Sequence, residues 1–141
     1  MRNGTTLVEM LTVLIIMGVL AGWAVPKLNA WADWIAVESA SREVAAFYSA
    51  ARFAAAQRGT RIRVQFAEDS LRAVFEGRHD SVFRVRPGPR VRGVSLHASQ
   101  AVVRIGSSGY GWAAGNTTVV MRRGAFVDSL IISRLGRLRW R

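Results

Sequence analysis

Gly4-Thr5-Thr6-Leu7-Val8-Glu9 opens an apolar run that continues to Val25, and this stretch decides how the chain folds. From Thr5 to Val25 there are 21 residues, of which only Glu9 is charged. About 20 apolar residues are enough to cross a bilayer as a helix. A carboxylate inside such a helix costs roughly 2.5–3.5 kcal/mol. We therefore expect a partner that neutralises Glu9.

Two other interpretations of this segment stay open. A secretory signal peptide has an apolar stretch of roughly 7–15 residues and then a cleavage site made of small residues. Here the stretch is longer, and Trp23, Pro26 and Lys27 stand where that cleavage site would be. The second alternative is an ordinary membrane anchor in which the glutamate is incidental. We favour a spanning helix in which Glu9 has a role.

The residues Gly4, Thr6, Leu7 and Glu9 resemble the N-terminal signal of type IV pilin-like proteins. In that family a glycine is followed by an apolar helix with glutamate at the fifth position. Thr5 stands where the family usually has phenylalanine. The resemblance implies that prepilin peptidase cuts between Gly4 and Thr5 and methylates the new amino group of Thr5. It also implies that the partners are other major and minor pilins or pseudopilins.

The chemistry of this signal gives Glu9 an assembly role. Cleavage would place a positive amino group one helical turn from Glu9. In a bundle of staggered subunits, that amine can meet the Glu9 carboxylate of a neighbour. A buried charge that is paired and hydrogen-bonded costs far less than an unpaired one, so this contact would favour one stagger over others. The alternative is that Glu9 lies at headgroup level and reaches water.

Composition fits a small extracytoplasmic domain behind the anchor. The 141 residues leave room for one domain of about 80 residues. The chain has no cysteine, which excludes disulfides and thiolate metal sites. The net charge is +11, and all basic residues except Lys27 are arginines. Arginine favours bidentate contacts with phosphates or carboxylates.

The anchor helix is expected to continue as a spine. An apolar stripe recurs at steps of three and four residues, at Val37, Ala40, Val44, Phe47, Ala51 and Ala54. Gly59 is the expected end of this helix. We expect a prepilin leader over 1–4, a transmembrane helix over 5–25, a helical spine over 26–59 and a globular β domain over 60–141.

The rest of the chain predicts strands. In 60–66, apolar residues alternate with polar ones, the pattern of a half-buried strand. Further strands are expected at 71–76, 82–86, 94–96, 102–105, 117–122, 125–133 and 135–140. Those from 94 onward are expected to form a second group, and 106–115 is expected to be a glycine-rich loop. The predicted fold class is α+β, with one long N-terminal helix packed on antiparallel β-sheet.

Several elements after the anchor resemble the GspH/FimT family, a branch of the pilin-like proteins. They are Arg58-Gly59 at the helix end, Gly93–Leu96, Thr118–Val120 and the terminal Gly136–Arg139. The resemblance implies a minor pseudopilin that assembles into a type II secretion pseudopilus for protein export. Its alternative is a minor type IV pilin that binds DNA during DNA uptake. Both would be single-pass proteins of the inner membrane with a periplasmic C-terminal domain, later incorporated into the filament.

A C-terminal row of arginines is the candidate DNA-binding site. On a strand, Arg137, Arg139 and Arg141 share one face. Arg134 and the pair Arg122-Arg123 would extend the row. Such a row can follow phosphates, and arginine richness over the whole domain supports a polyanion as partner. The alternative is a solvated edge strand whose charges block pairing between sheets.

The sequence argues against an enzyme. The only histidines are His79 in a charged turn and His97 after a strand, and both are expected to be ordinary surface residues. No cofactor and no metal site is expected. Tyr110 and Trp112 in the glycine-rich loop offer aromatic surface to nucleic-acid bases. Filling gaps over the sheet is the interpretation we favour for them.

Overall fold

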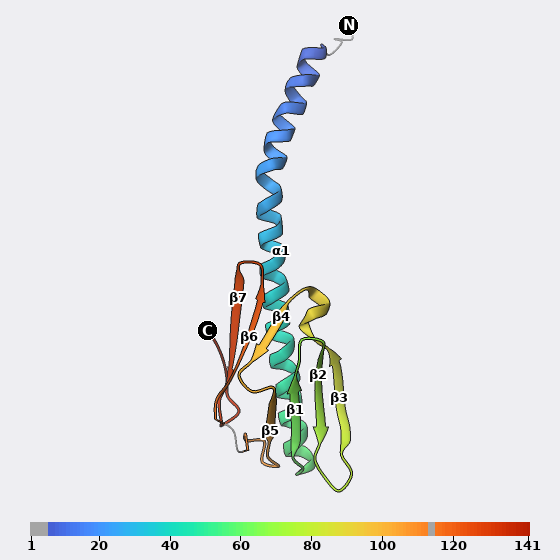
Figure 1. The fold of residues 1–141 in the computed structure, drawn as a ribbon, viewed down its shortest axis with the longest axis vertical. Helices are drawn as coiled ribbons and strands as arrows, with labels where there is room; N and C mark the ends of the chain where they lie inside the picture. Colours follow the sequence, from blue (N-terminus) through green and yellow to red (C-terminus); the bar gives the residue numbers. More distant parts are fainter. Residues whose placement is uncertain (1–5, 113–114) are drawn as a thin grey trace. The chain divides into compact units, whose positions relative to one another are not determined.

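Residues 6–112 and 115–141 are described by a computed structural model of the chain (Figure 1). They form one long helix, a short 3-10 helix and eight strands in two sheets. The chain divides into two units, residues 1–32 and residues 33–141. The second unit contains the C-terminal half of the helix and every strand.

Helix α1 (Leu7–Arg58) is continuous over the apolar segment and the expected spine. Its C-terminal half buries the stripe predicted from the sequence: Val37, Ala40, Val44, Phe47, Ala51 and Ala54. The helix ends at Gly59, which adopts a left-handed conformation with φ of 59°. Glycine takes this conformation without steric cost. The Thr60 amide then donates to the Ala55 carbonyl over 3.2 Å, which closes the last turn.

The first sheet has the strand order β3-β2-β1-β5, and its strands are antiparallel. These strands are β1 (Ile62–Phe66), β2 (Ser70–Phe75), β3 (Ser81–Pro87) and β5 (Val102–Ile105). In β1, buried and less buried residues alternate as predicted, and the buried ones are Ile62, Val64 and Phe66. On the opposite face, the Arg63 guanidinium pairs with Asp80 over 2.8 Å.

The second sheet has the order β4-β6-β7-β8 and is also antiparallel. The 3-10 helix η1 (Pro89–Arg92) leads into it. Its strands are β4 (Ser95–Ala98), β6 (Thr117–Arg123), β7 (Phe126–Ile132) and β8 (Leu138–Trp140). The edge strand β8 is shorter than the predicted 135–140, because residues 133–137 form the turn out of β7.

One predicted grouping is wrong. Strand β5 was expected in the second group, yet it pairs with β1 in the first sheet. The register opposes Ile105 to Ile62 and Val103 to Val64, and all four side chains are buried. Burial of these apolar pairs outweighs the preference for pairing strands that are neighbours in sequence.

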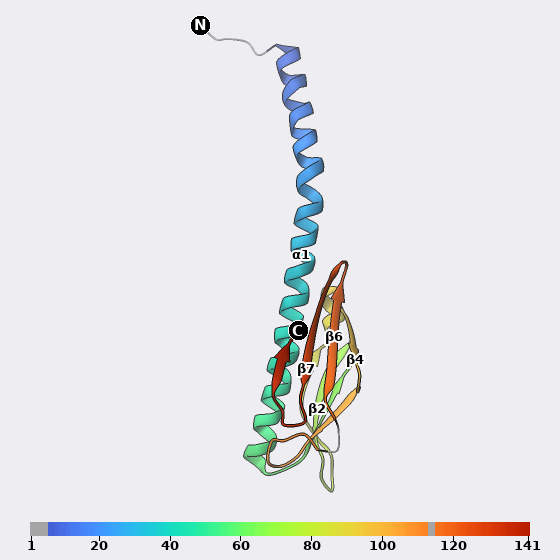
Figure 2. The ribbon, with the colours of Figure 1, turned by 90° about the vertical axis from the view of Figure 1, so that its left-hand side faces the viewer.

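Both sheets pack against α1 around one core. The buried cluster takes side chains from the C-terminal half of α1 and from both sheets, for example Tyr48, Leu71 and Met121. Figure 2 shows β2, β4, β6 and β7 along one side of this part of the helix. The predicted α+β class, a long N-terminal helix on antiparallel sheet, is confirmed.

The hydroxyl of Tyr48 is a buried polar group in this core without a hydrogen-bond partner among the described residues. The side chain is fully buried. Burial raises the pKa of Tyr48 above its ordinary value, and the positive charge of Arg52 opposes this rise. The folded state therefore holds this proton more tightly than the unfolded state. Stability should fall as the pH rises above about 10.

Tyr48→Phe should stabilise the fold. Removal of the unsatisfied hydroxyl is expected to raise the free energy of unfolding at pH 7 by about 1 kcal/mol. The variant should also lose less stability above about pH 10. Denaturant unfolding of the full chain in detergent at the two pH values measures both effects. Tyr110→Phe, at the other tyrosine, which is exposed, should change neither.

Candidate functional site

Glu9 lies in the first turn of α1 and its side chain is exposed. The Glu9 amide donates to both the carbonyl and the Oγ1 of Thr6, over 3.1 and 3.3 Å. Thr6 therefore caps the helix, and Thr6-x-x-Glu9 has the spacing of a capping box. Sequence reasoning missed this cap, although the Thr-x-x-Glu spacing was visible. Gly4 and Thr5, the expected cleavage and methylation site, lie outside the described residues.

The N-terminal half of α1 exposes its apolar side chains. The helix is long and apolar enough to cross a membrane. An 18-residue stretch within it has a mean hydropathy of 2.2, and none of that stretch is buried. Leu7 and Val8 are 77% and 70% exposed. An apolar surface of this size needs a membrane or other helices to cover it. Just after the apolar segment, the Lys27 ammonium lies 3.6 Å from the centre of the Trp23 ring. Such a cation–π contact is suited to the interface between membrane and water.

The arginine row lies along the free edge of the second sheet. Backbone pairing with β7 extends beyond β8, since the Ser133 amide donates to Arg137 and the Arg141 amide donates to Ser129. Between the arginines, Leu138 packs on the core, and the Trp140 indole donates to Ser41 of α1 over 3.1 Å. Alternation therefore turns Arg137, Arg139 and Arg141 to the opposite, outer face.

The neighbouring arginines divide into two groups. Arg122 is exposed on the same outer face of β6, and Arg134 is exposed in the turn after β7. Arg123 points the other way, pairs with Asp33 of α1 over 2.8 Å and donates to the Arg92 carbonyl. Its expected place in the row is therefore wrong, because alternation along β6 turns it toward the helix.

The outer-face arginines have no acidic partner within the chain. Among residues 6–112 and 115–141, no ion pair involves any of the five arginines of the outer face and turn: Arg122, Arg134, Arg137, Arg139 and Arg141. Their guanidinium groups are thus available to an anionic ligand.

Arg52 is a structural residue that sequence reasoning missed. From α1, its Nε donates to the Gly109 carbonyl over 2.8 Å and its Nη1 to the Gly136 carbonyl over 3.1 Å. It joins the helix to the loop after β5 and to the turn before β8. Gly136 has φ of 74°, and a Cβ there would lie 2.9 Å from the Arg52 Nε. The glycine therefore makes room for the arginine.

Arg52→Ala should loosen both connections. Loss of two hydrogen bonds from a charged, half-buried donor is expected to lower the free energy of unfolding by about 2 kcal/mol. Denaturant unfolding of the full chain measures the change. Arg42→Ala is the matched control, because Arg42 forms only an exposed pair with Glu38; its effect should stay below about 0.5 kcal/mol. Equal effects of the two variants would show that Arg52 does not hold these segments.

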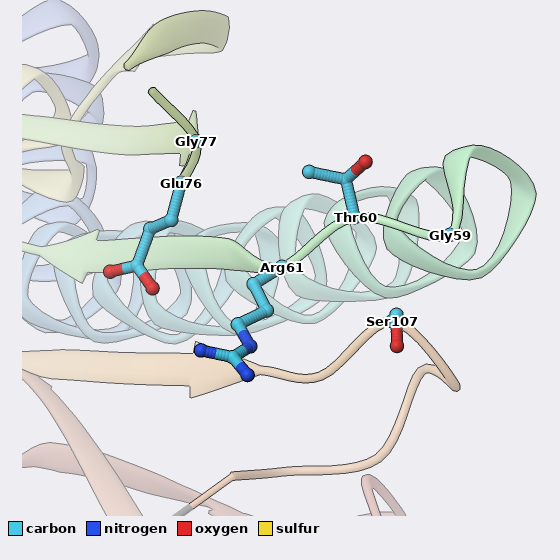
Figure 3. Close-up of a pocket in the computed structure, with 6 residues that line it drawn as sticks. All are labelled: Gly59, Thr60, Arg61, Glu76, Gly77 and Ser107. Atoms are coloured by element: carbon cyan, nitrogen blue, oxygen red, sulfur yellow. The ribbon is translucent and has the colours of Figure 1, made fainter. Parts of the chain in front are cut away.

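A polar groove of about 510 Å³ lies where α1 ends (Figure 3). It is lined by Gly59, Thr60, Arg61, Glu76, Gly77 and Ser107. The Arg61 guanidinium lies 3.1 Å from the centre of the Trp112 ring. The Glu76 carboxylate accepts from Arg104 over 3.2 Å. Both charged groups are thus engaged in the structure of the domain itself.

The described part of the chain offers no cluster of three or more histidine, cysteine, aspartate or glutamate side chains that could hold a metal ion. His79 lies in the turn before β3, as expected from the sequence, whereas His97 lies within β4 and not after a strand, because β4 extends to Ala98. Trp112 is stacked by Arg61, and both Trp112 and Tyr110 are exposed, by 40% and 52%. The gap-filling role expected for these aromatics stays a prediction.

Neither a scan of protein-family models nor a search of curated proteins finds a match for this sequence. Solved structures do match. FimU, a type IV minor pilin of Pseudomonas aeruginosa strain PAO1, aligns in one crystal form with a TM-score of 0.65 and 17% identity, over 74% of this chain and 87% of FimU. A second crystal form gives 0.62 and 16%, over 74% of this chain and 92% of FimU. At this identity the likeness concerns the fold: the protein has a type IV pilin-like fold.

Proposed function

We propose that this protein is a minor subunit of a pilin-type filament. The observation that carries the proposal is the exposed apolar half of α1 with the single acid Glu9 in its first turn. The pilin-like fold behind this helix supports the proposal, since FimU is a type IV minor pilin. The role is structural: the chain contributes a helix to a bundle and displays a domain outside it, without catalysis.

The proposed sequence of events starts in the inner membrane. The apolar segment anchors the chain there, with the C-terminal domain in the periplasm. Prepilin peptidase removes residues 1–4 between Gly4 and Thr5 and methylates the amino group of Thr5. The subunit then leaves the bilayer for the filament, where the amine of one subunit pairs with Glu9 of a neighbour. In the first form of the proposal, this filament is a type II secretion pseudopilus that serves protein export.

The arginine row favours a second candidate function. A minor type IV pilin could use Arg134, Arg137, Arg139 and Arg141 to bind DNA during uptake. The outer-face position of these arginines and their lack of acidic partners within the described residues support this form. Loss of reporter export on deletion of the gene would favour the pseudopilus, and loss of DNA uptake would favour the pilus.

Processing is the first test of this function. The protein isolated from its native cells should lack residues 1–4 and should begin with a methylated Thr5. Gly4→Leu should remain uncut, because the peptidase would no longer find the small residue before the cut. Intact-mass measurement of both proteins checks this, with Gly18→Leu as a control for a glycine change within the anchor. A wild-type protein that keeps Met1 would contradict the proposal.

A further inference from the structure

Three exposed apolar residues adjoin Arg52 or the glycines whose carbonyls accept from it. Phe53, Tyr110 and Leu135 are 64%, 52% and 58% exposed. Phe53 follows Arg52 in α1, while Tyr110 and Leu135 adjoin Gly109 and Gly136, whose carbonyls accept from Arg52. The Gly111 amide also donates to the Arg134 carbonyl over 3.0 Å, which joins the loop to the turn. We call Phe53, Tyr110 and Leu135 the Arg52 cluster.

A groove beside this cluster can receive a side chain. It has a volume of about 310 Å³ and is lined by Ser49, Arg52, Phe53, Ala56, Ser108 and Gly109. Its lining residues other than Arg52 and Phe53 are small. Gly109 lies close to the helix, since a Cβ there would be 3.5 Å from the Ala56 Cβ. The groove is therefore open to one apolar side chain from outside.

The residues around the groove carry positive charge, which favours a partner with an acidic surface. The segments 44–67, 81–127 and 129–141, which supply the cluster and the groove, contain no aspartate or glutamate. Arg134 and Arg137 are exposed in the turn that carries Leu135 and Gly136, and the Gly136 carbonyl accepts from Arg52. Aromatic residues and arginine with few acids are the composition of protein interfaces. A partner surface with carboxylates around an apolar side chain would be complementary.

A second copy of this chain would not complement the groove, because few of its carboxylates are unpaired. Six of the nine acids form ion pairs within the described residues: Asp33, Glu38, Glu43, Asp69, Glu76 and Asp80. Only Glu9, Glu68 and Asp128 remain, and Glu9 belongs to the anchor. With a net charge of +11, two copies would also repel each other at this surface.

We propose that the Arg52 cluster docks a different subunit of the same filament, one with an acidic surface. An apolar side chain of that subunit enters the groove against Phe53, and its carboxylates face Arg134 and Arg137. The inference rests on the proposed filament role. It adds the surface, the chemistry of the partner and the requirement that the contact be between unlike subunits.

Site-specific photocross-linking of the full chain in its native cells tests this. A benzophenone amino acid is placed at Phe53 or Tyr110, at Leu14 in the anchor, and at Val91, which is 77% exposed away from the cluster. Positions 53 and 110 should each give one protein product, in which mass spectrometry finds an acidic segment of another filament subunit. Val91 should give at least 10-fold less of it. Leu135→Ala should reduce the product from position 53 several-fold without changing thermal unfolding.

The outcomes separate the docking surface from the filament role. A product with a second copy of this chain, or a nuclease-sensitive product with DNA, would overturn the inference. So would an absence of products at 53 and 110 when Leu14 still cross-links to filament subunits, and in that case the proposed function stands. If Leu14 also gives no product with another subunit, the filament role and the docking surface both fall.

Discussion

Glu9→Gln is expected to abolish incorporation of the protein into its filament while the chain stays folded and inserted in the membrane. Glutamine keeps the Thr6 cap, because the backbone amide of residue 9, and not its side chain, donates to Thr6 Oγ1. It removes only the negative charge. Loss of one partner from a buried ion pair costs about 3–5 kcal/mol. The amount in the filament should therefore fall by a factor on the order of 10²–10⁴, which immunoblots of sheared filaments and membranes measure.

This substitution tests the charge of Glu9 while the Thr6 cap is kept. If that charge has no part in assembly, Glu9→Gln should assemble as well as the wild type, and the pairing hypothesis would be wrong. Glu9→Asp keeps the charge on a shorter side chain and should retain partial assembly. Glu68→Gln neutralises an acid of the globular domain that forms no ion pair within the described residues, and it should assemble normally.

Local patterns were enough to predict most elements of the fold. Alternation in β1 and the spacing of the apolar stripe in α1 each depend only on residues close in sequence. Gly59 could be predicted as the helix end because a left-handed residue there favours glycine. These features require no knowledge of which strands become neighbours.

Features that depend on distant segments could not be predicted. Strand β5 returns to β1 across more than 30 residues, and only the burial of Ile105 against Ile62 explains this. Arg52 gave no signal in the sequence, because its acceptors are backbone carbonyls 57 and 84 residues away. Arg123 looked like part of the arginine row until its partner on α1, Asp33, was known.

Many arginines of the domain have no acidic partner within the described residues. Most acids of the domain form ion pairs within it, and several of these pairs join different elements, such as Glu43 with Arg92 and Asp33 with Arg123. Within the described residues, arginines without an ion pair lie on the outer face of the second sheet and in the adjacent turn, and others lie beside the first sheet, at Arg72, Arg78 and Arg86. Exposed ion pairs contribute little to stability. Removing unpaired arginines from the outer face should therefore affect ligand binding much more than folding.

Simultaneous replacement of Arg137, Arg139 and Arg141 by alanine is expected to remove salt-dependent DNA binding. Three phosphate contacts give a slope of about −2 to −3 in log K against log salt. The affinity of the wild type should thus drop roughly 20- to 60-fold between 50 and 200 mM salt. The variant should bind weakly at both concentrations with a slope near zero. Fluorescence anisotropy with a labelled duplex and the full chain in detergent measures both slopes.

The control must change the net charge equally at another surface. Arg72, Arg78 and Arg86 are exposed and form no ion pair within the described residues, and all three lie on or beside β2 and β3 of the first sheet. Their replacement by alanine should leave the slope of log K against log salt almost unchanged, because the phosphate contacts are made by the arginine row on β8 and not by the first sheet. Equal losses in both triple variants would mean that DNA responds to net charge alone. In that case the row on β8 only protects the sheet edge from pairing with another sheet.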